Sequence, residues 1–212
     1  MKLKLLTIFI LTSFYALGQE TVLKEKKGES YYVLKDDPKI KHGTFQYSTK
    51  KGLVEKGQYY NDKKVGIWEF YDNEGNIEQK YDYTLKQIVF NKETRQFGGY
   101  KITIDNKPTD IKPDTIPMFI GGTSRYYRYL QENLKYPKKS KSMGTEGRQL
   151  VIISLSNEGE VLTTQIFRTI ATDIDEEALR LMNELKNDWT PARHQGKNVS
   201  VTFQVPVLFR LN

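Results

Sequence analysis

The sequence contains no cysteine and only two histidines, His42 and His194, among its 212 residues. Without cysteine the chain forms no disulfides, so its fold depends on a hydrophobic core, and thiol nucleophiles and thiolate metal sites are excluded. Neither histidine is accompanied by a nucleophile or a further ligand in a pattern that supports acid–base or metal chemistry. We therefore expect a protein that is not an enzyme and that binds neither a metal nor another cofactor.

Long apolar runs are scarce as well, and the clearest one spans residues 5–17. It follows Lys2 and Lys4 and ends in small residues before Gln19, an arrangement typical of a secretory signal peptide. No cysteine follows it, which excludes lipoprotein attachment, and the run is short for a membrane span of about 20 residues. We expect residues 1–18 to be a signal peptide. An uncleaved inner-membrane anchor is the alternative, and membrane contact is expected only in that case.

Acidic residues are fewer than basic ones, 26 against 33, which gives a formal net charge of +7. The lysines are spread along the chain in small groups, as on a solvated surface. Attraction to anionic surfaces of the cell envelope, which salt would weaken, is the alternative. Export argues against nucleic acid as a partner.

The first half of the chain contains two copies of one pattern at a constant spacing. The corresponding pairs are Gly43 and Gly66, Phe45 and Trp68, Tyr47 and Phe70, Gly52 and Gly75, Val54 and Ile77, and Tyr60 and Tyr83. Glycine before alternating aromatic residues at a fixed period predicts stacked β-hairpins, because one hairpin cannot bury its aromatic side chains alone. We expect Phe45, Trp68 and Phe70 to form the core of a small sheet, while exposed tyrosines could contact a partner.

The two copies resemble MORN-type repeats over about residues 42–83. Apolar stretches at residues 31–34, 88–90 and 100–104 are expected to be degenerate copies that cap the array. The resemblance implies an all-β repeat region, which we assign to residues 19–106.

Three prolines then fall within residues 107–117, namely Pro108, Pro113 and Pro117. This stretch has no clear periodicity, and we expect a short, stiff linker between two domains.

The end of the chain alternates strictly between apolar and other residues. The apolar residues are Val199, Val201, Phe203, Val205, Val207, Phe209 and Leu211. This alternation predicts a strand with one buried face. Pro206 cannot donate to a β-ladder and suits a sheet edge, and an open edge can accept a strand of another protein. Alternatively, a loop covers the edge, or Arg210 and Pro206 blunt it.

Other elements precede this strand. Residues 149–155 and 161–167 predict a hairpin around a glycine turn. Asp173 is expected to cap a helix, whose apolar face is Ile174, Ala178, Leu181, Leu185 and Trp189. An earlier helix, capped by Thr123 or Ser124, is expected to present Tyr127, Leu130 and Leu134, and Tyr136-Pro137 precedes a short helix. We expect residues 118–212 to form an α+β domain, a small antiparallel three-stranded sheet with helices on one face.

Several short motifs in this domain occur in a characteristic order. They are Pro117-Met-Phe119 before Gly121-Gly122, Tyr136-Pro137, Glu146-Gly147, Asn157-Glu-Gly159, Glu177-Ala178-Leu179, Trp189-Thr-Pro191 and Val205-Pro206-Val207. From about residue 114 to the end, the chain resembles the TonB C-terminal domain family. One departure is Ser140, where the family usually has a small apolar residue, and we expect it on a short exposed turn.

The resemblance implies a periplasmic domain that binds the TonB box, a short peptide of outer-membrane transporters, by strand addition to its last strand. Carried onto this sequence, the implied partner-binding residues are Tyr136, Pro137, Val199, Ser200, Val201, Thr202, Phe203, Gln204 and Val205. Pro206 would limit how far a partner strand can pair.

We therefore expect a non-catalytic periplasmic protein-binding protein that engages TonB-dependent transporters or similar partners. One alternative is a membrane-anchored energy transducer for outer-membrane transport, although the long proline-rich segment of such proteins is missing. Another is a structural envelope protein that acts through its repeats, with the C-terminal domain as a possible homodimerisation module.

Overall fold

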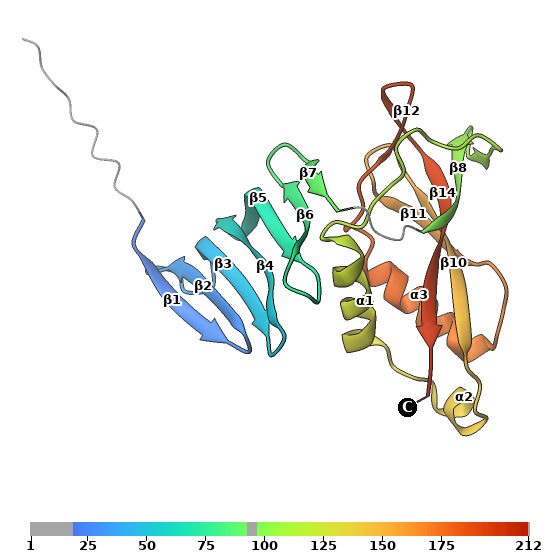
Figure 1. The fold of residues 1–212 in the computed structure, drawn as a ribbon, viewed down its shortest axis with the longest axis horizontal. Helices are drawn as coiled ribbons and strands as arrows, with labels where there is room; N and C mark the ends of the chain where they lie inside the picture. The colour runs from blue at the N-terminus through green and yellow to red at the C-terminus, as the bar shows by residue number, and fades with distance from the viewer. Residues whose placement is uncertain (1–18, 93–96, 212) are drawn as a thin grey trace, which may run out of the picture.

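A computed structural model describes residues 19–92 and 97–211 of the chain. It has an all-β sheet on the N-terminal side and an α+β domain on the C-terminal side, with helix α1 between the two sheets (Figure 1). The expected signal peptide, residues 1–18, lies outside the described residues.

The N-terminal sheet consists of seven antiparallel strands that follow one another in chain order. They are β1 (Thr21–Lys26), β2 (Glu29–Leu34), β3 (Lys41–Thr49), β4 (Gly52–Tyr60), β5 (Lys63–Tyr71), β6 (Ile77–Asp82) and β7 (Gln87–Asn91). The two copies of the sequence pattern are the hairpins β3–β4 and β5–β6, which confirms the predicted hairpins.

Aromatic side chains form the core of this sheet on one of its faces. Phe45, Trp68 and Phe70 are buried, as predicted, and the rings of Phe45 and Trp68 stack with centroids 5.4 Å apart. The indole of Trp68 lies directly over Gly57 of the neighbouring strand, where an added Cβ would come within 2.3 Å of the ring. Glycine is therefore needed there for the aromatic stack to close over the strand.

The C-terminal sheet has five strands instead of the expected three, in the order β11-β10-β14-β8-β9. They are β8 (Gly98–Ile104), β9 (Lys107–Pro108), β10 (Gly147–Leu155), β11 (Val161–Ile166) and β14 (Val201–Phe209). The predicted hairpin is β10–β11.

Strand β8 does not cap the N-terminal array, contrary to expectation. Ile102 is buried, and the ring of Tyr100 stacks on Phe203 with centroids 5.5 Å apart. Strand β8 thus belongs to the C-terminal sheet, and Tyr100 packs against the core of that domain. Periodicity alone could not assign this strand to one sheet or the other.

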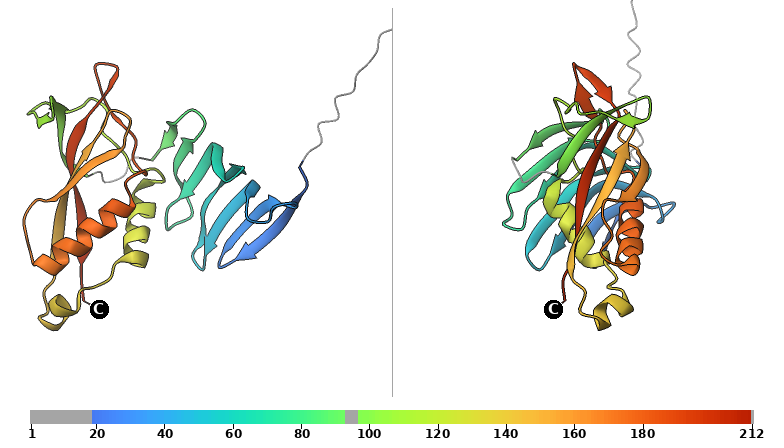
Figure 2. Two further views of the ribbon diagram at one scale, coloured as in Figure 1. Left: turned by 180° about the vertical axis from the view of Figure 1, so that it is seen from behind. Right: turned by 90° about the vertical axis from the view of Figure 1, so that its right-hand side faces the viewer.

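Three helices complete the domain: α1 (Gly122–Asn133), α2 (Lys138–Ser142) and α3 (Thr172–Glu184). Helices α1 and α3 pack on one face of the sheet around a common core (Figure 2). On α1 the expected apolar face is partly wrong, because Tyr126 is fully buried and Tyr127 is 49% exposed. The Tyr126 hydroxyl donates to the Pro206 carbonyl over 2.9 Å, which sets the orientation of the helix.

Helix α3 buries Ile174, Ala178 and Leu181, as predicted. Its N-cap is Ala171 rather than Asp173. The Asp173 carboxylate instead accepts hydrogen bonds from the backbone N–H and the hydroxyl of Ser140, the latter over 2.7 Å. Ser140 is therefore buried and not on an exposed turn, and its hydroxyl links α2 to α3.

The predicted last strand is interrupted at Ser200. Strand β13 (Lys197–Val199) pairs with β12 (Ala192–His194) before β14 begins. Within the expected linker, the Asp114 carboxylate accepts a hydrogen bond from the backbone N–H of Gln195 over 2.7 Å. The proline-containing stretch is thus held against the β12–β13 hairpin.

The junction between the two sheets is made by β6 and the start of α1. Glu78 is 1% exposed, and its carboxylate accepts hydrogen bonds from the backbone N–H groups of Thr123 and Ser124 and from the Thr123 hydroxyl. The Gln79 side chain accepts from Gly121 N–H over 2.6 Å. Because α1 has no side-chain cap of its own, Glu78 supplies both the missing acceptor and a negative charge at the positive helix end.

Candidate functional site

The outer edge of β14 is the candidate site that the sequence indicates, and part of it is already paired. On one side β14 pairs with β10 along its whole length. On the other side it pairs with β8, where Val201 is opposite Ile102, Thr202 opposite Lys101 and Gln204 opposite Gly98. The chain's own strand therefore occupies the edge from Val201 to Gln204.

The side chains of the predicted site residues on β14 fall into two sets. Val201, Phe203 and Val205 are fully buried in the core, so only their backbone could take part in pairing. Thr202 and Gln204 face the opposite side of the sheet. The Thr202 hydroxyl lies 3.1 Å from that of Thr103 on β8.

The remaining predicted residues lie at both ends of the strand. Val199 ends β13, and the Ser200 carbonyl accepts the backbone N–H of Thr103 over 2.9 Å. Tyr136 lies at the far end, where its ring packs against Phe209 with centroids 5.8 Å apart, and Pro137 caps α2. At about 3.3 Å per residue, Tyr136 lies more than ~20 Å along the strand from Thr202. The structure thus brings residues 199–205 together but leaves Tyr136 and Pro137 apart from them.

Beyond Gln204 this side of β14 is no longer paired with β8. Among the described residues, no strand pairs with this side of β14 after Gln204. Pro206 has no N–H, and its carbonyl is bound by Tyr126, so Leu208 is the next residue that can offer outward backbone groups. The Leu208 side chain is 44% exposed beside a hollow of about 550 Å³. A leucine at an outward position of the alternating strand was the sequence signal for this surface, and our reading of the sequence missed it.

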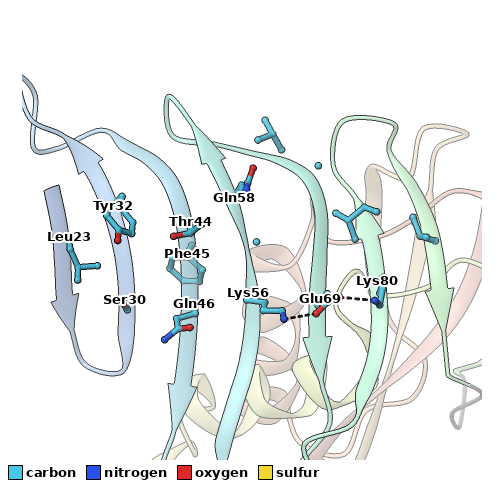
Figure 3. Close-up of a pocket in the computed structure, with 15 residues that line it drawn as sticks. Leu23, Ser30, Tyr32, Thr44, Phe45, Gln46, Lys56, Gln58, Glu69 and Lys80 are labelled. Atoms are coloured by element: carbon cyan, nitrogen blue, oxygen red, sulfur yellow. Dashed lines mark hydrogen bonds and ion pairs between the residues drawn. The ribbon is translucent and has the colours of Figure 1, made fainter. Parts of the chain in front are cut away.

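The N-terminal sheet has a second broad surface, on the face opposite its aromatic core (Figure 3). A hollow of about 940 Å³ lies over it. Across its floor the Glu69 carboxylate pairs with Lys56 at 3.0 Å and with Lys80 at 2.7 Å. Hydrogen bonds from Lys80, Tyr71 and Lys56 lower the pKa of Glu69 to about 2. Both lysines on this floor are thus paired with Glu69 within the sheet.

Neither histidine lies in a catalytic arrangement. His42 contacts Asn61, and His194 contacts Asp114, each through Nδ1 at 3.1 Å. Within residues 19–92 and 97–211, no group of three or more His, Asp or Glu side chains is placed to hold a metal ion. Over the same residues, none of the helices has the length and apolar character needed to cross a membrane.

Residues 132–211 match the family model described as Gram-negative bacterial TonB protein C-terminal. The match begins at the end of α1 and covers α2, α3 and β10 to β14, but neither the N-terminal sheet nor β8. This family is a non-enzymatic protein-interaction domain of the Gram-negative periplasm. No curated protein and no solved structure matched the chain.

Proposed function

We propose that this chain is a non-catalytic periplasmic protein that binds an extended segment of a partner by strand addition to the outer edge of β14. The periplasmic peptide of an outer-membrane transporter is the proposed partner. The family match of residues 132–211 supports this class of function. The observation that carries the proposal is the pairing of β8 with β14. Strand β8 lies outside the segment that matches the family, so this side of β14 already accepts a strand from another part of the chain.

Strand β8 is a weaker neighbour of β14 than β10 is. It pairs at three positions with a register irregularity between Thr202 and Gln204, whereas β10 pairs at nine consecutive positions from Gly147 to Leu155. A partner segment would replace β8 along residues 199–205 and pair with the backbone groups that point to that side, such as the Ser200 carbonyl. Tyr136 and Pro137 would support the far end of the strand through Phe209.

We further propose that the N-terminal sheet is a MORN-type array that positions the C-terminal domain. The two hairpin copies and the capping of α1 by Glu78 support this role. Export by a signal peptide at residues 1–18 belongs to the same proposal. A scaffold that acts through the broad face of this sheet is the second candidate function, and the hollow over that face favours it.

A disulfide between β8 and β14 tests the first proposal, because the chain has no cysteine of its own. Lys101 and Thr202 are opposite each other, and opposed Cα atoms in antiparallel strands lie about 4.5–5.5 Å apart, within disulfide range. The probe is a fluorescent peptide with the TonB-box sequence of a transporter from the source organism. Lys101→Cys/Thr202→Cys should bind it when reduced and lose binding when oxidised.

The matched control is Ile152→Cys/Gln165→Cys, which links β10 to β11 at another opposed pair and leaves the β14 edge free. It should bind the peptide equally in both redox states. Equal binding by the oxidised Lys101→Cys/Thr202→Cys protein would remove residues 199–205 from the binding site.

A further inference from the structure

Two hollows meet along helix α1. The first, of about 550 Å³, lies between α1, α2 and the end of β14. The second, of about 380 Å³, lies between α1 and the turns of the N-terminal sheet, including the β3–β4 turn at Lys50 and Lys51. Tyr127 and Gln131, one helical turn apart, line both. The β3–β4 turn, the end of α1 and the end of β14 all lie on the lower side of the molecule in Figure 1 and in the left view of Figure 2.

The charged side chains along these hollows are mostly cationic. Their cationic lining residues are Lys50, Lys51, Arg128, Lys141 and Arg210, against a single carboxylate, Glu132. Among the described residues, none of these cations lies within 4.0 Å of a carboxylate oxygen, unlike Lys56 and Lys80 on the sheet face. The charge of this surface is therefore available to an anionic ligand.

The floor of the first hollow suits an extended chain. Leu134, Leu208 and the ring of Tyr136 line it with apolar surface. Leu208 lies on β14 beyond the reach of β8, so its outward backbone groups can pair with an extended segment. An anionic lipid surface would use the charge but not this backbone edge, and therefore a peptide is the better match.

We propose that the two hollows form one groove, the α1 groove, which binds an acidic, extended peptide segment with alternating apolar side chains. The apolar side chains would lie on Leu134 and Leu208, and the carboxylates would face the cations along the groove. The N-terminal sheet thereby contributes Lys50 and Lys51 to the binding surface of the C-terminal domain. This proposal rests on the proposed function, because the segment continues the one that β14 receives.

The test is the binding of a fluorescein-labelled peptide that alternates glutamate and valine. Binding is measured by fluorescence anisotropy at low salt with the chain from residue 19 to residue 212. Lys50→Glu/Lys51→Glu should weaken binding about three- to tenfold, since two attractive contacts become repulsive. The control Lys24→Glu/Lys26→Glu changes the net charge equally on the exposed strand β1 and should bind like the unaltered protein. A peptide that alternates lysine and valine should not bind.

Several results would overturn the proposal. One is no binding of the acidic peptide by the unaltered protein, and another is an equal loss in both charge variants, which would indicate net charge alone. The third is stronger binding to phosphatidylglycerol vesicles than to the peptide. The oxidised Lys101→Cys/Thr202→Cys protein separates the two proposals. If it still binds the acidic peptide in a charge-sensitive way, the α1 groove is supported and the displacement of β8 is contradicted. If oxidation abolishes binding of the transporter peptide while Lys50→Glu/Lys51→Glu has no effect on binding, strand addition is supported and the α1 groove is contradicted.

Discussion

The hydroxyl of Thr202 lies 3.1 Å from that of Thr103, which precedes it by 99 residues. The Thr202 hydroxyl also lies 3.2 Å from that of Ser154 on β10. This contact between three neighbouring strands marks the place where β8 covers the edge of β14. A substitution at Thr202 can therefore weaken the pairing of β8 with β14 without changing the buried core.

Thr202→Val should weaken the attachment of β8. The valine keeps the shape of threonine but removes both hydroxyl contacts, at an expected cost of about 1 kcal/mol in the free energy of unfolding. Hydrogen exchange should become faster for the amides of β8, while the amides of β10 that pair with β14 stay protected. Thr163→Val on the exposed side of β11 is the control and should change neither quantity. Equal exchange rates for β8 in both variants would contradict the prediction.

Glu78→Ala should destabilise the junction between the two regions. The substitution leaves the backbone N–H groups of Thr123 and Ser124 without their acceptor at a nearly buried position, which costs about 1–3 kcal/mol. We expect a lower midpoint in urea unfolding and a separation of the transition into two steps, as the regions lose their coupling. Glu25→Ala, at an exposed position of β1, should stay within about 0.5 kcal/mol of the unaltered protein.

Gly57→Ala should disturb the aromatic core of the N-terminal sheet. The added Cβ would come within 2.3 Å of the Trp68 ring, which is fully buried and has little room to move. Overpacking of this kind costs about 1–3 kcal/mol, measured by urea unfolding, and should reduce the near-ultraviolet circular dichroism signal. At Gly98 an added Cβ meets nothing within 4 Å, so Gly98→Ala should leave that signal intact. A Gly57→Ala protein as stable as Gly98→Ala would contradict the packing seen around Trp68.

Glu69 should make the stability of the N-terminal sheet depend on pH in the acidic range. Its folded-state pKa, about 2, lies below the ordinary value of 4.5, so its contribution to stability is present above pH ~4.5 and is lost as the pH falls towards ~2. Glu69→Gln cannot titrate, so its free energy of unfolding should fall less over that window. The comparison is urea unfolding at a series of pH values, with the exposed Glu25→Gln as the control. Parallel pH curves for Glu69→Gln and the unaltered protein would show that the ion pairs contribute nothing.

Elements whose pattern repeats over many residues could be predicted from the sequence. The aromatic repeat predicted the hairpins around Phe45 and Trp68, and alternation predicted the buried side of β14, because local periodicity reports which side chains face a core. The order of short motifs from Tyr136 to Pro191 indicated the family that residues 132–211 match. Each of these inferences depends on neighbours close in sequence.

Only the tertiary structure decided what each face packs against. Ile102 and Tyr100 would have the same apolar pattern in either sheet. The pairing of Ile102 with Val201 and the stacking of Tyr100 on Phe203 place β8 beside β14. The capping of α1 by Glu78 likewise joins residues 45 positions apart. Periodicity therefore determined that β14 has one buried face, while long-range packing determined that β8 pairs with one part of this strand and leaves Leu208 unpaired on that side.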